Sequence, residues 1–392
     1  MFDLTTIFEI LFWICFALVV YTYPGYPLVI RCLAAVFGRR AAPKDLPTSS
    51  LPKLSLLVAA HNEASIIAAR IANALAMDYP RDRLEIVVAT DGCTDGTAEV
   101  VKGFAEQGVR LLEYPVRRGK ATVLNDSIPR LTGDMVILSD ANTFTEPEAA
   151  RRLARWFPDP RIGVVCGRLI LTDPATGSNV DGIYWKYETY LKRCESRLGA
   201  LLGANGGIYA IRRSCFRPIP TDTIVDDFIL PLQAKLQTGC SIVYEPEAVA
   251  HEETPPDIRS EFRRRARIGA GGFQSVGRIW RLLNPARGWI AFTFFSHKIL
   301  RWACPFFLIG LIVASVALWE TPPYRALLLA QVAFYALSAV VPHISTRSRV
   351  LKPLGLTTMF TGMNVALLLG FWRWAAGTQQ GIWQRTVRPG EA

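Results

Sequence analysis

Residues 135–142 read Met-Val-Ile-Leu-Ser-Asp-Ala-Asn, an apolar run that ends in an acid and, two residues later, an amide. A short apolar run of this kind is typical of a buried strand. The carboxylate of Asp140 should therefore lie at the carboxyl end of a sheet strand, the edge at which open α/β sheets bind ligands. Asp140 and Asn142 together offer oxygen ligands to Mg²⁺ or Mn²⁺. Strand-end acids also cap helices and turns, so this stretch alone leaves both interpretations open.

Strands and helices alternate upstream of this stretch. Apolar runs at 54–60, 84–90 and 109–113 predict strands, and the segments 64–77, from about 96, and 120–128 predict helices. Such alternation is typical of an α/β fold with a mainly parallel sheet and helices on both of its faces.

Two of these predicted strands also end in acids. The first runs into His61-Asn62-Glu63, and the second runs into Asp91, with Asp95 expected to cap the next helix. Acids at one sheet edge repel one another unless a basic group or a metal lies among them. Lys120, in the sequence Arg118-Gly119-Lys120, is the candidate cation, although an ordinary solvated lysine is the simpler interpretation.

Apolar segments flank the α/β region on both sides. They cover residues 7–23, 303–319, 325–341 and 354–372, each about long enough to cross a bilayer. The first segment lacks the basic start and the cleavage site of a signal peptide. We therefore expect a multi-pass membrane protein. Residues 289–302 mix aromatic and basic side chains, which predicts an interfacial helix lying in the membrane plane.

Basic residues predict the orientation of the chain in the membrane. The N-terminal tail has none, whereas Arg31, Arg39, Arg40 and Lys44 follow the first segment. The positive-inside rule then places the α/β region on the cytoplasmic side of the inner membrane. Three later spans would put the basic C-terminal tail outside, so either one segment is interfacial or re-entrant, or the tail breaks the rule.

The expected domain organisation has four parts. They are an N-terminal transmembrane helix and linker (1–45), the cytoplasmic α/β domain (46–287), an interfacial helix with about three membrane segments (288–376), and a tail (377–392).

The net charge and the cysteine spacing indicate which partners the protein binds and in which redox state its cysteines are. The formal net charge of +11 is typical of nucleic-acid-binding proteins, but no nucleic-acid-binding motif is present. Much of the basic charge flanks apolar segments, so we expect membrane lipids and no nucleic acid as partners. The eight cysteines show no CxxC or paired Cys/His spacing, which predicts reduced, structural thiols.

Further motifs follow in order along the chain. They are Gly-Ala-Asn-Gly-Gly at 203–207, Val-Asp-Asp at 225–227 and an arginine-rich segment at 259–287. With the upstream motifs, this ordered set resembles the membrane-bound family 2 glycosyltransferases of GT-A fold. That group contains cellulose, chitin and hyaluronan synthases and bacterial exopolysaccharide enzymes. The resemblance covers about residues 50–290.

The resemblance implies an inverting, metal-dependent transfer of a sugar from a nucleotide-sugar donor to a glycan or lipid-linked acceptor. Asp227 would be the general base that deprotonates the acceptor hydroxyl, with Asp226 beside it, although this pair could instead cap the helix beginning near Phe228. The remaining implied roles are donor binding by Glu63, Asp91, Lys120, Asp140 and Arg267, acceptor binding by Asn205, Gly206 and Gly207, and metal binding by Asp140 and Asn142.

The chain departs from the family pattern at three places, of which the first, His61 where a proline commonly precedes the Asn-Glu pair, should change little. Asn142 replaces the second acid of the usual metal motif, and Arg264-Arg265-Ala266-Arg267-Ile268 keeps the arginine of the Gln-x-x-Arg-Trp motif but loses its Gln and Trp. A processive exopolysaccharide synthase, with partner subunits of an export system, and a single-addition glycolipid-forming transferase therefore both stay open. A non-catalytic nucleotide-sugar-binding module is the contrasting class. Residues 383–388 are similar to the segment that covers the donor pocket in hyaluronan-type synthases.

Overall fold

The computed structural model describes residues 3–39, 43–172, 182–253, 258–341, 354–379 and 381. The chain divides into two compact units. One comprises Met1–Val29, Asp257–Val276 and Phe294–Gln379, and the other comprises Ile30–Pro256, Gly277–Thr293 and Gln380–Ala392. The predicted domain boundaries stay predictions. The segment at 383–388 lies outside the described residues.

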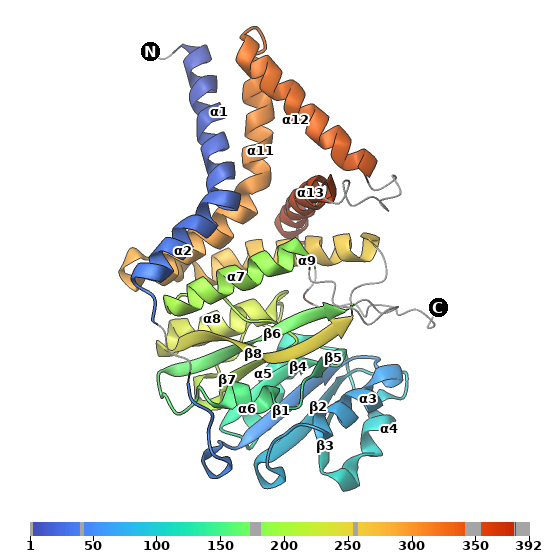
Figure 1. Ribbon diagram of the computed structural model, residues 1–392. Helices are drawn as coiled ribbons and strands as arrows, with labels where there is room; N and C mark the ends of the chain where they lie inside the picture. The colour runs from blue at the N-terminus through green and yellow to red at the C-terminus, as the bar shows by residue number, and fades with distance from the viewer. Residues whose placement is uncertain are drawn as a thin grey trace. The chain divides into compact units, whose positions relative to one another are not determined.

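The second unit is built on one eight-stranded mixed sheet (Figure 1). Its strands in spatial order are β3 (Val109–Tyr114), β2 (Leu84–Asp91), β1 (Leu54–Ala60), β4 (Met135–Asp140), β7 (Tyr209–Arg212), β6 (Ile162–Thr172), β8 (Ser241–Glu253) and β5 (Thr143–Thr145). The pairs β3–β2, β2–β1, β1–β4 and β6–β8 are parallel, whereas β4–β7, β7–β6 and β8–β5 are antiparallel. The predicted α/β class and mainly parallel sheet are thus approximately right.

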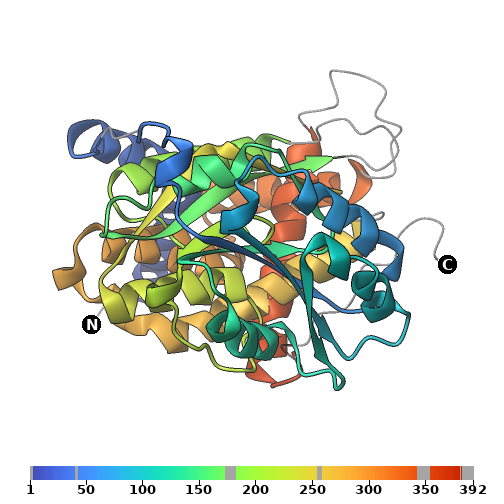
Figure 2. The same ribbon diagram turned by 90° about the horizontal axis from the view of Figure 1, so that it is seen from below.

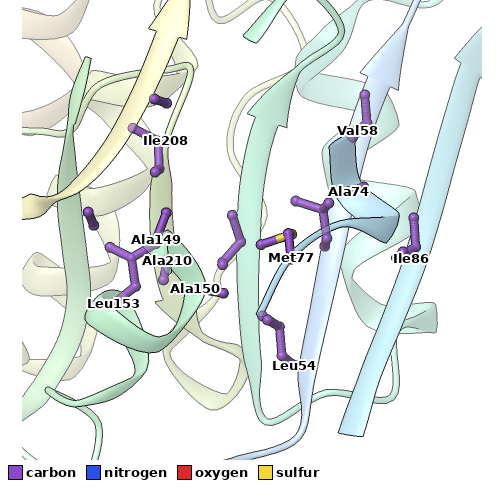
Figure 3. Close-up of a cluster of buried hydrophobic side chains, with 14 of the residues drawn as sticks. Leu54, Val58, Ala74, Met77, Ile86, Ala149, Ala150, Leu153, Ile208 and Ala210 are labelled. Atoms are coloured by element: carbon purple, nitrogen blue, oxygen red, sulfur yellow. The ribbon is translucent and has the colours of Figure 1, made fainter. Parts of the chain in front are cut away.

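Helices cover both faces of this sheet (Figures 1 and 2). They are α3 (Ala64–Leu75), α4 (Thr97–Lys102), α5 (Lys120–Ser127), α6 (Ala149–Ala154), α7 (Ile183–Arg197) and α8 (Asp226–Thr238). One core cluster joins α3, α4 and α6 to one face of the sheet. Strand residues such as Leu54 and Val58 point into this cluster (Figure 3). Leu57 and Val87 are equally buried outside that cluster, so the strands are apolar on both faces.

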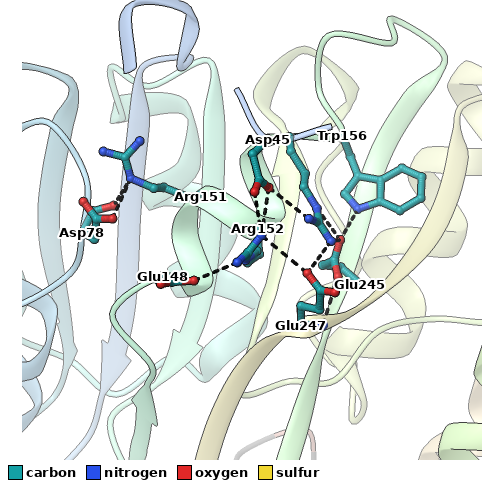
Figure 4. Close-up of polar contacts among 9 residues, drawn as sticks. Asp45, Asp78, Glu148, Arg151, Arg152, Trp156, Glu245 and Glu247 are labelled. Atoms are coloured by element: carbon teal, nitrogen blue, oxygen red, sulfur yellow. Dashed lines mark hydrogen bonds and ion pairs between the residues drawn. The ribbon is translucent and has the colours of Figure 1, made fainter. Parts of the chain in front are cut away.

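An ion-pair network fastens the segment that leads into the first strand (Figure 4). Asp45 accepts hydrogen bonds from Arg152 at 2.9 Å and from Arg155 at 3.0 Å. Arg155 also lies 2.8 Å from Glu245, whose side chain is 1% exposed, and 2.9 Å from Glu247. The network therefore ties the linker to α6 and β8 through charged groups, one of which is almost fully buried.

Four described helices are long and apolar enough to cross a membrane. They cover Leu4–Val36, Trp289–Ala317, Pro322–Val340 and Gly355–Ala375, and each overlaps one predicted apolar segment. The interfacial placement of residues 289–302 stays a prediction. These residues run through α10 (Trp289–Thr293) and a π-helical turn (Phe294–Ile299) into α11 (Leu300–Ala317).

Within the first unit, α1 (Leu4–Val20) packs along α11. The rings of Phe12 and of Tyr324, which belongs to α12 (Pro322–Val340), meet edge to face with their centroids 5.1 Å apart. The sulfur of Cys15 lies where a side chain at Gly310 would begin, 2.7 Å from the position of its Cβ. Glycine at this position permits the close approach of the two helices. The unit also contains α13 (Gly355–Ala375) and most of α9 (Ile258–Ile279).

Candidate active site

Three parallel strands bring their carboxyl ends to one edge of the sheet. Ala60 of β1 pairs with Thr90 of β2, and Ala59 pairs with Asp140 of β4. Asp91 therefore follows directly at the same edge. This register confirms the shared edge predicted from the acids that end each apolar run.

Asp91 is fully buried, and its carboxylate holds the Arg118–Lys120 turn. Its Oδ1 accepts a hydrogen bond from the N–H of Arg118 at 2.7 Å, and its Oδ2 accepts one from the N–H of Gly119 at 2.8 Å. The turn requires glycine at position 92, where φ is +59° and a Cβ would lie 2.5 Å from the backbone nitrogen of Arg117. Asp91 thereby fixes the start of α5, whose first residue is Lys120.

The His61–Glu63 segment joins the starts of two helices. Glu63 is buried at the N-cap position of α3, and its N–H donates to the hydroxyl of Thr97 at 2.9 Å. Asp95 accepts from the N–H of Ala64 at 3.0 Å and from the N–H of Thr97 at 3.1 Å. The predicted capping role of Asp95 is confirmed and extends to α3 as well as α4.

Lys120 lies between two carboxylates. Its Nζ is 2.7 Å from Asp140 Oδ1 and 3.2 Å from Asp226 Oδ2, and only 18% of its side chain is exposed. Burial lowers the pKa of Lys120, but the carboxylates of Asp140 and Asp226 outweigh this effect and raise the pKa above its usual value. The side chain is therefore a permanent cation among the strand-end acids and not an ordinary solvated lysine.

Asp227 lies beside this cluster at the first turn of α8. Burial and the neighbouring charge of Asp226 raise its pKa to about 6, against the opposing effect of Lys120. The carboxylate is therefore poised to exchange a proton near neutral pH. The backbone carbonyl of Asp227 accepts from the N–H of Ala204 at 2.9 Å, which fastens the 203–207 loop to α8.

Gly206 marks the place where two carboxylates converge. A Cβ built on this residue would lie 3.1 Å from Asp227 Oδ2 and 3.6 Å from Asp140 Oδ2. A side chain here would fill the space in front of both acids, so glycine keeps that space open. The structure thus brings Asp140, Asp226, Asp227, Lys120 and Gly206 together.

The neighbouring loop residues bind the protein itself. The Asn205 side chain is buried, accepts a hydrogen bond from Lys192 Nζ and donates to the carbonyl of Gly167 at 2.6 Å. The carbonyl of Gly207 accepts from the Ser139 hydroxyl at 2.8 Å. These contacts hold the loop against β4 and β6, and the acceptor-binding role of Asn205, Gly206 and Gly207 stays a prediction.

The predicted metal ligands offer part of a coordination shell. Asp140 Oδ2 faces the space at Gly206, and Asn142 Nδ2 donates a hydrogen bond to Glu252 Oε1 at 3.4 Å. No group of three or more His, Cys, Asp or Glu side chains forms a metal site within the described ranges. Carboxylate and amide oxygens are the ligand types that Mg²⁺ or Mn²⁺ accepts, and a diphosphate and water would supply the remaining ligands.

The structure adds two residues that the sequence did not single out. The Tyr209 hydroxyl is fully buried near Asp226, Asp227 and Asp140 and has no hydrogen-bond partner in the described part of the chain. Burial is the main cause that raises its pKa far above the usual value. Arg70 is also fully buried, and it donates to Ser139 Oγ at 3.2 Å beneath Asp140.

One of these two residues left a signal in the sequence. Arg70 lies three residues after the apolar Ile67, on the inward stripe of a helical pattern, which indicates an inward-facing cation. Tyr209 left no such signal. Arg267 lies on α9 in the other unit, so its donor-binding role stays a prediction.

Comparison with known proteins agrees with this geometry. Residues 55–218 match the family model described as glycosyl transferase family 2. These residues form a family 2 glycosyltransferase domain. The fold is that of the GT-A glycosyltransferases: the chain superposes with a TM-score of 0.71 on the mannosyltransferase PcManGT from Pyrobaculum calidifontis, solved with GDP-Man and Mn²⁺. That match covers 93% of this chain and 99% of the other at 24% identity.

Similar curated proteins are named poly-beta-1,6-N-acetyl-D-glucosamine synthase. The Staphylococcus epidermidis protein is 26% identical over 234 residues, which are 56% of this chain and 55% of that protein. A Staphylococcus aureus protein (strain COL) is 27% identical over 243 residues, 59% of this chain and 57% of that protein. The chain thus spans about half the length of the curated relatives that it matches. The four apolar helices make this chain a candidate membrane protein.

Proposed function

We propose that the protein is an inverting, metal-dependent glycosyltransferase that moves a sugar from a nucleotide-sugar to a glycan or lipid-linked acceptor. The observation that carries this proposal is the convergence of Asp227 and Asp140 on the open space at Gly206. One carboxylate with a pKa near neutrality faces this space, and the other is bound to a cation. Base catalysis and leaving-group stabilisation require these two features side by side.

Asp227 acts as the general base in the proposed reaction. It takes the proton of the acceptor hydroxyl as that oxygen forms its bond to the anomeric carbon of the donor sugar. The bond from this carbon to the diphosphate breaks in the same step, so the configuration inverts. A carboxylate with its ordinary low pKa would be a weaker base than one raised to about 6.

Lys120 and Asp140 serve the departing nucleoside diphosphate. Lys120 contributes a fixed positive charge, which the Asp91-bound turn holds in place. Asp140 and Asn142 would hold a divalent cation, which when bound neutralises the charge that develops on the diphosphate. Glu63, beside Asp91 at the same edge, would contact the base or ribose of the donor, and Arg267 would pair with the diphosphate.

Two versions of the reaction differ in their acceptor and in the length of their product. The relatives named polysaccharide synthases support exopolysaccharide synthesis with export partners. Ile268, in place of the tryptophan that would stack on an acceptor sugar, supports a single addition to a lipid-linked acceptor. In both versions we place the catalytic domain at the cytoplasmic face of the inner membrane, in contact with membrane lipids.

Incubation of purified membranes with labelled nucleotide-sugars and Mg²⁺ or Mn²⁺ tests the function. Nucleotide-activated N-acetylglucosamine and GDP-mannose are the first donors to try, since similar proteins are named for these sugars. We expect a product that is lost with EDTA and in Asp227→Asn but kept in Asp82→Asn, which changes an exposed surface carboxylate. A large product would support processive synthesis, and a small lipid-extractable one would support single addition. Metal-dependent donor binding without turnover across the panel would support the non-catalytic module.

A further inference from the structure

Two cysteines far apart in the sequence meet at one glycine of the sheet. Cys215 ends the short 3₁₀ helix after β7, and Cys240 stands between α8 and β8. Strand β6 lies between β7 and β8, and its Gly163 falls at an irregularity in the pairing with β8. A Cβ on Gly163 would overlap the Cys240 side chain and lie 3.1 Å from Cys215 Sγ. The missing side chain therefore makes the space in which both sulfurs lie.

The two thiols are in contact and differ in acidity. They hydrogen-bond to each other and to the hydroxyl of Thr238. The hydrogen bond from Cys240 is the main cause that lowers the pKa of Cys215, with Arg212 and Arg217 acting in the same direction, whereas the pKa of Cys240 is raised. A thiolate next to a protonated thiol is the arrangement from which disulfides form.

Two other buried cysteines have no lowered thiol pKa. Cys166 is fully buried and Cys194 nearly so, and burial raises the pKa of each thiol. Cys215 and Cys240 are also mostly covered, with 8% and 6% of their surface exposed. A small oxidant is therefore the reagent that suits them, since a protein partner would need a wider opening.

We propose that Cys215 and Cys240 form a reversible redox site, which a hydroperoxide oxidises to an intramolecular disulfide. The Cys215 thiolate attacks the peroxide oxygen, breaks the O–O bond and becomes a sulfenic acid as hydroxide leaves. The Cys240 thiol then attacks this sulfur, forming the S–S bond and releasing water. Two electrons pass from the two thiols to the peroxide, and a dithiol reductant reverses the change.

The disulfide would enclose the helix that carries the acid pair. Residues 215–240 include Asp226, Asp227 and the whole of α8. A disulfide needs its sulfurs about 2.05 Å apart, closer than two hydrogen-bonded thiols. Oxidation must therefore draw the two ends of this segment together. The site thus links the redox state of the protein to the placement of α8.

Peptide mapping of the reduced, full-length protein in detergent tests the proposal without reference to glycosyl transfer. The protein is treated with hydrogen peroxide, its remaining thiols are alkylated, and it is digested for mass spectrometry. We expect a peptide pair joined through Cys215 and Cys240, released by dithiothreitol, while Cys166 and Cys194 stay reduced. Cys215→Ser should abolish this cross-link.

Gly163→Ala is the second variant, since it keeps both thiols and places a methyl group between them. We expect its cross-link yield to fall at least tenfold, whereas Gly277→Ala, whose Cβ meets nothing within 4 Å, should match the wild type. The proposal is overturned if wild-type Cys215 and Cys240 stay alkylatable to the same extent as Cys194 after oxidation. Over-oxidation of Cys215 to sulfinic acid without a cross-link would also overturn it.

Discussion

Gly206→Ala is the sharpest test of where the reaction takes place. The backbone at Gly206 is not in the left-handed region, so alanine introduces no strain of its own. Its Cβ would lie 3.1 Å from Asp227 Oδ2, closer than the ordinary contact of 3.4–4 Å, and 3.6 Å from Asp140 Oδ2, within that range. The added methyl therefore displaces the proposed base by a few tenths of an ångström and leaves Asp140 where it is.

The expected loss of rate follows from this displacement. If a misplacement of about 1 Å costs roughly 100-fold, a shift of about 0.3 Å costs about 4-fold. The methyl group also occupies part of the space that an acceptor hydroxyl would enter. We expect kcat to fall about 4- to 10-fold, an increase of roughly 0.8–1.4 kcal/mol in the activation free energy.

The assay separates chemistry from donor binding. Release of nucleoside diphosphate at saturating donor gives kcat, and calorimetric titration with the nucleoside diphosphate and Mn²⁺ gives Kd. Gly206→Ala should lower kcat and keep Kd within about twofold, because its Cβ makes only an ordinary contact with Asp140. Gly277→Ala, in open space on α9, is the matched control and should change neither quantity. An unchanged kcat in Gly206→Ala, or an equal rise in Kd, would refute the placement of the reacting atoms at Gly206.

The contacts of individual charged side chains lead to three further predictions. The rate of sugar transfer should fall as the pH falls through about 6, because Asp227 must be ionised to accept a proton. Asp226→Asn should move the midpoint of this fall to lower pH, because it removes a like charge beside Asp227. A pH–rate profile of each protein measures both effects. Asp91→Asn should weaken donor binding by titration calorimetry, since an amide NH₂ would face one of the two N–H groups that the carboxylate now binds. Arg155→Met should cost about 3 kcal/mol of stability and lower the melting temperature, because it leaves the buried Glu245 without its cation; Arg161→Met, on the exposed surface, should leave that temperature unchanged.

The parallel half of the sheet could be predicted because its strands are apolar on both faces and end in acids. Leu54–Ala60 and Met135–Asp140 are short, buried runs with no helical period, so their type and ends are visible in the sequence. The antiparallel half could not be predicted. Strand β7 is four residues long, and it pairs with strands that lie far from it in the chain. Nothing local in the sequence specifies such pairings.

Sequence position identified the acids of the site, but the roles we propose for them depend on partners that only the folded structure shows. Asp91 and Asp140 both end buried strands, yet Asp91 gives both oxygens to backbone N–H groups, whereas Asp140 gives one to Lys120 and turns the other to the open space at Gly206. A carboxylate that is fully satisfied by the backbone is suited to holding a loop. A carboxylate with a free oxygen beside a fixed cation is suited to a ligand.

The same argument distinguishes the two acids of α8. Asp226 lies 3.2 Å from Lys120, so its charge is partly compensated, and the charge of Asp226 in turn disfavours ionisation of its neighbour. Burial and the like charge of Asp226 are the dominant effects on Asp227, and they raise its pKa to about 6, a value suited to a general base near neutral pH. Adjacent and chemically identical in the sequence, the two residues differ in the fold because α8 presents only one of them to Lys120. That contact supports the proposed assignment of the base to Asp227, which the family resemblance also implies.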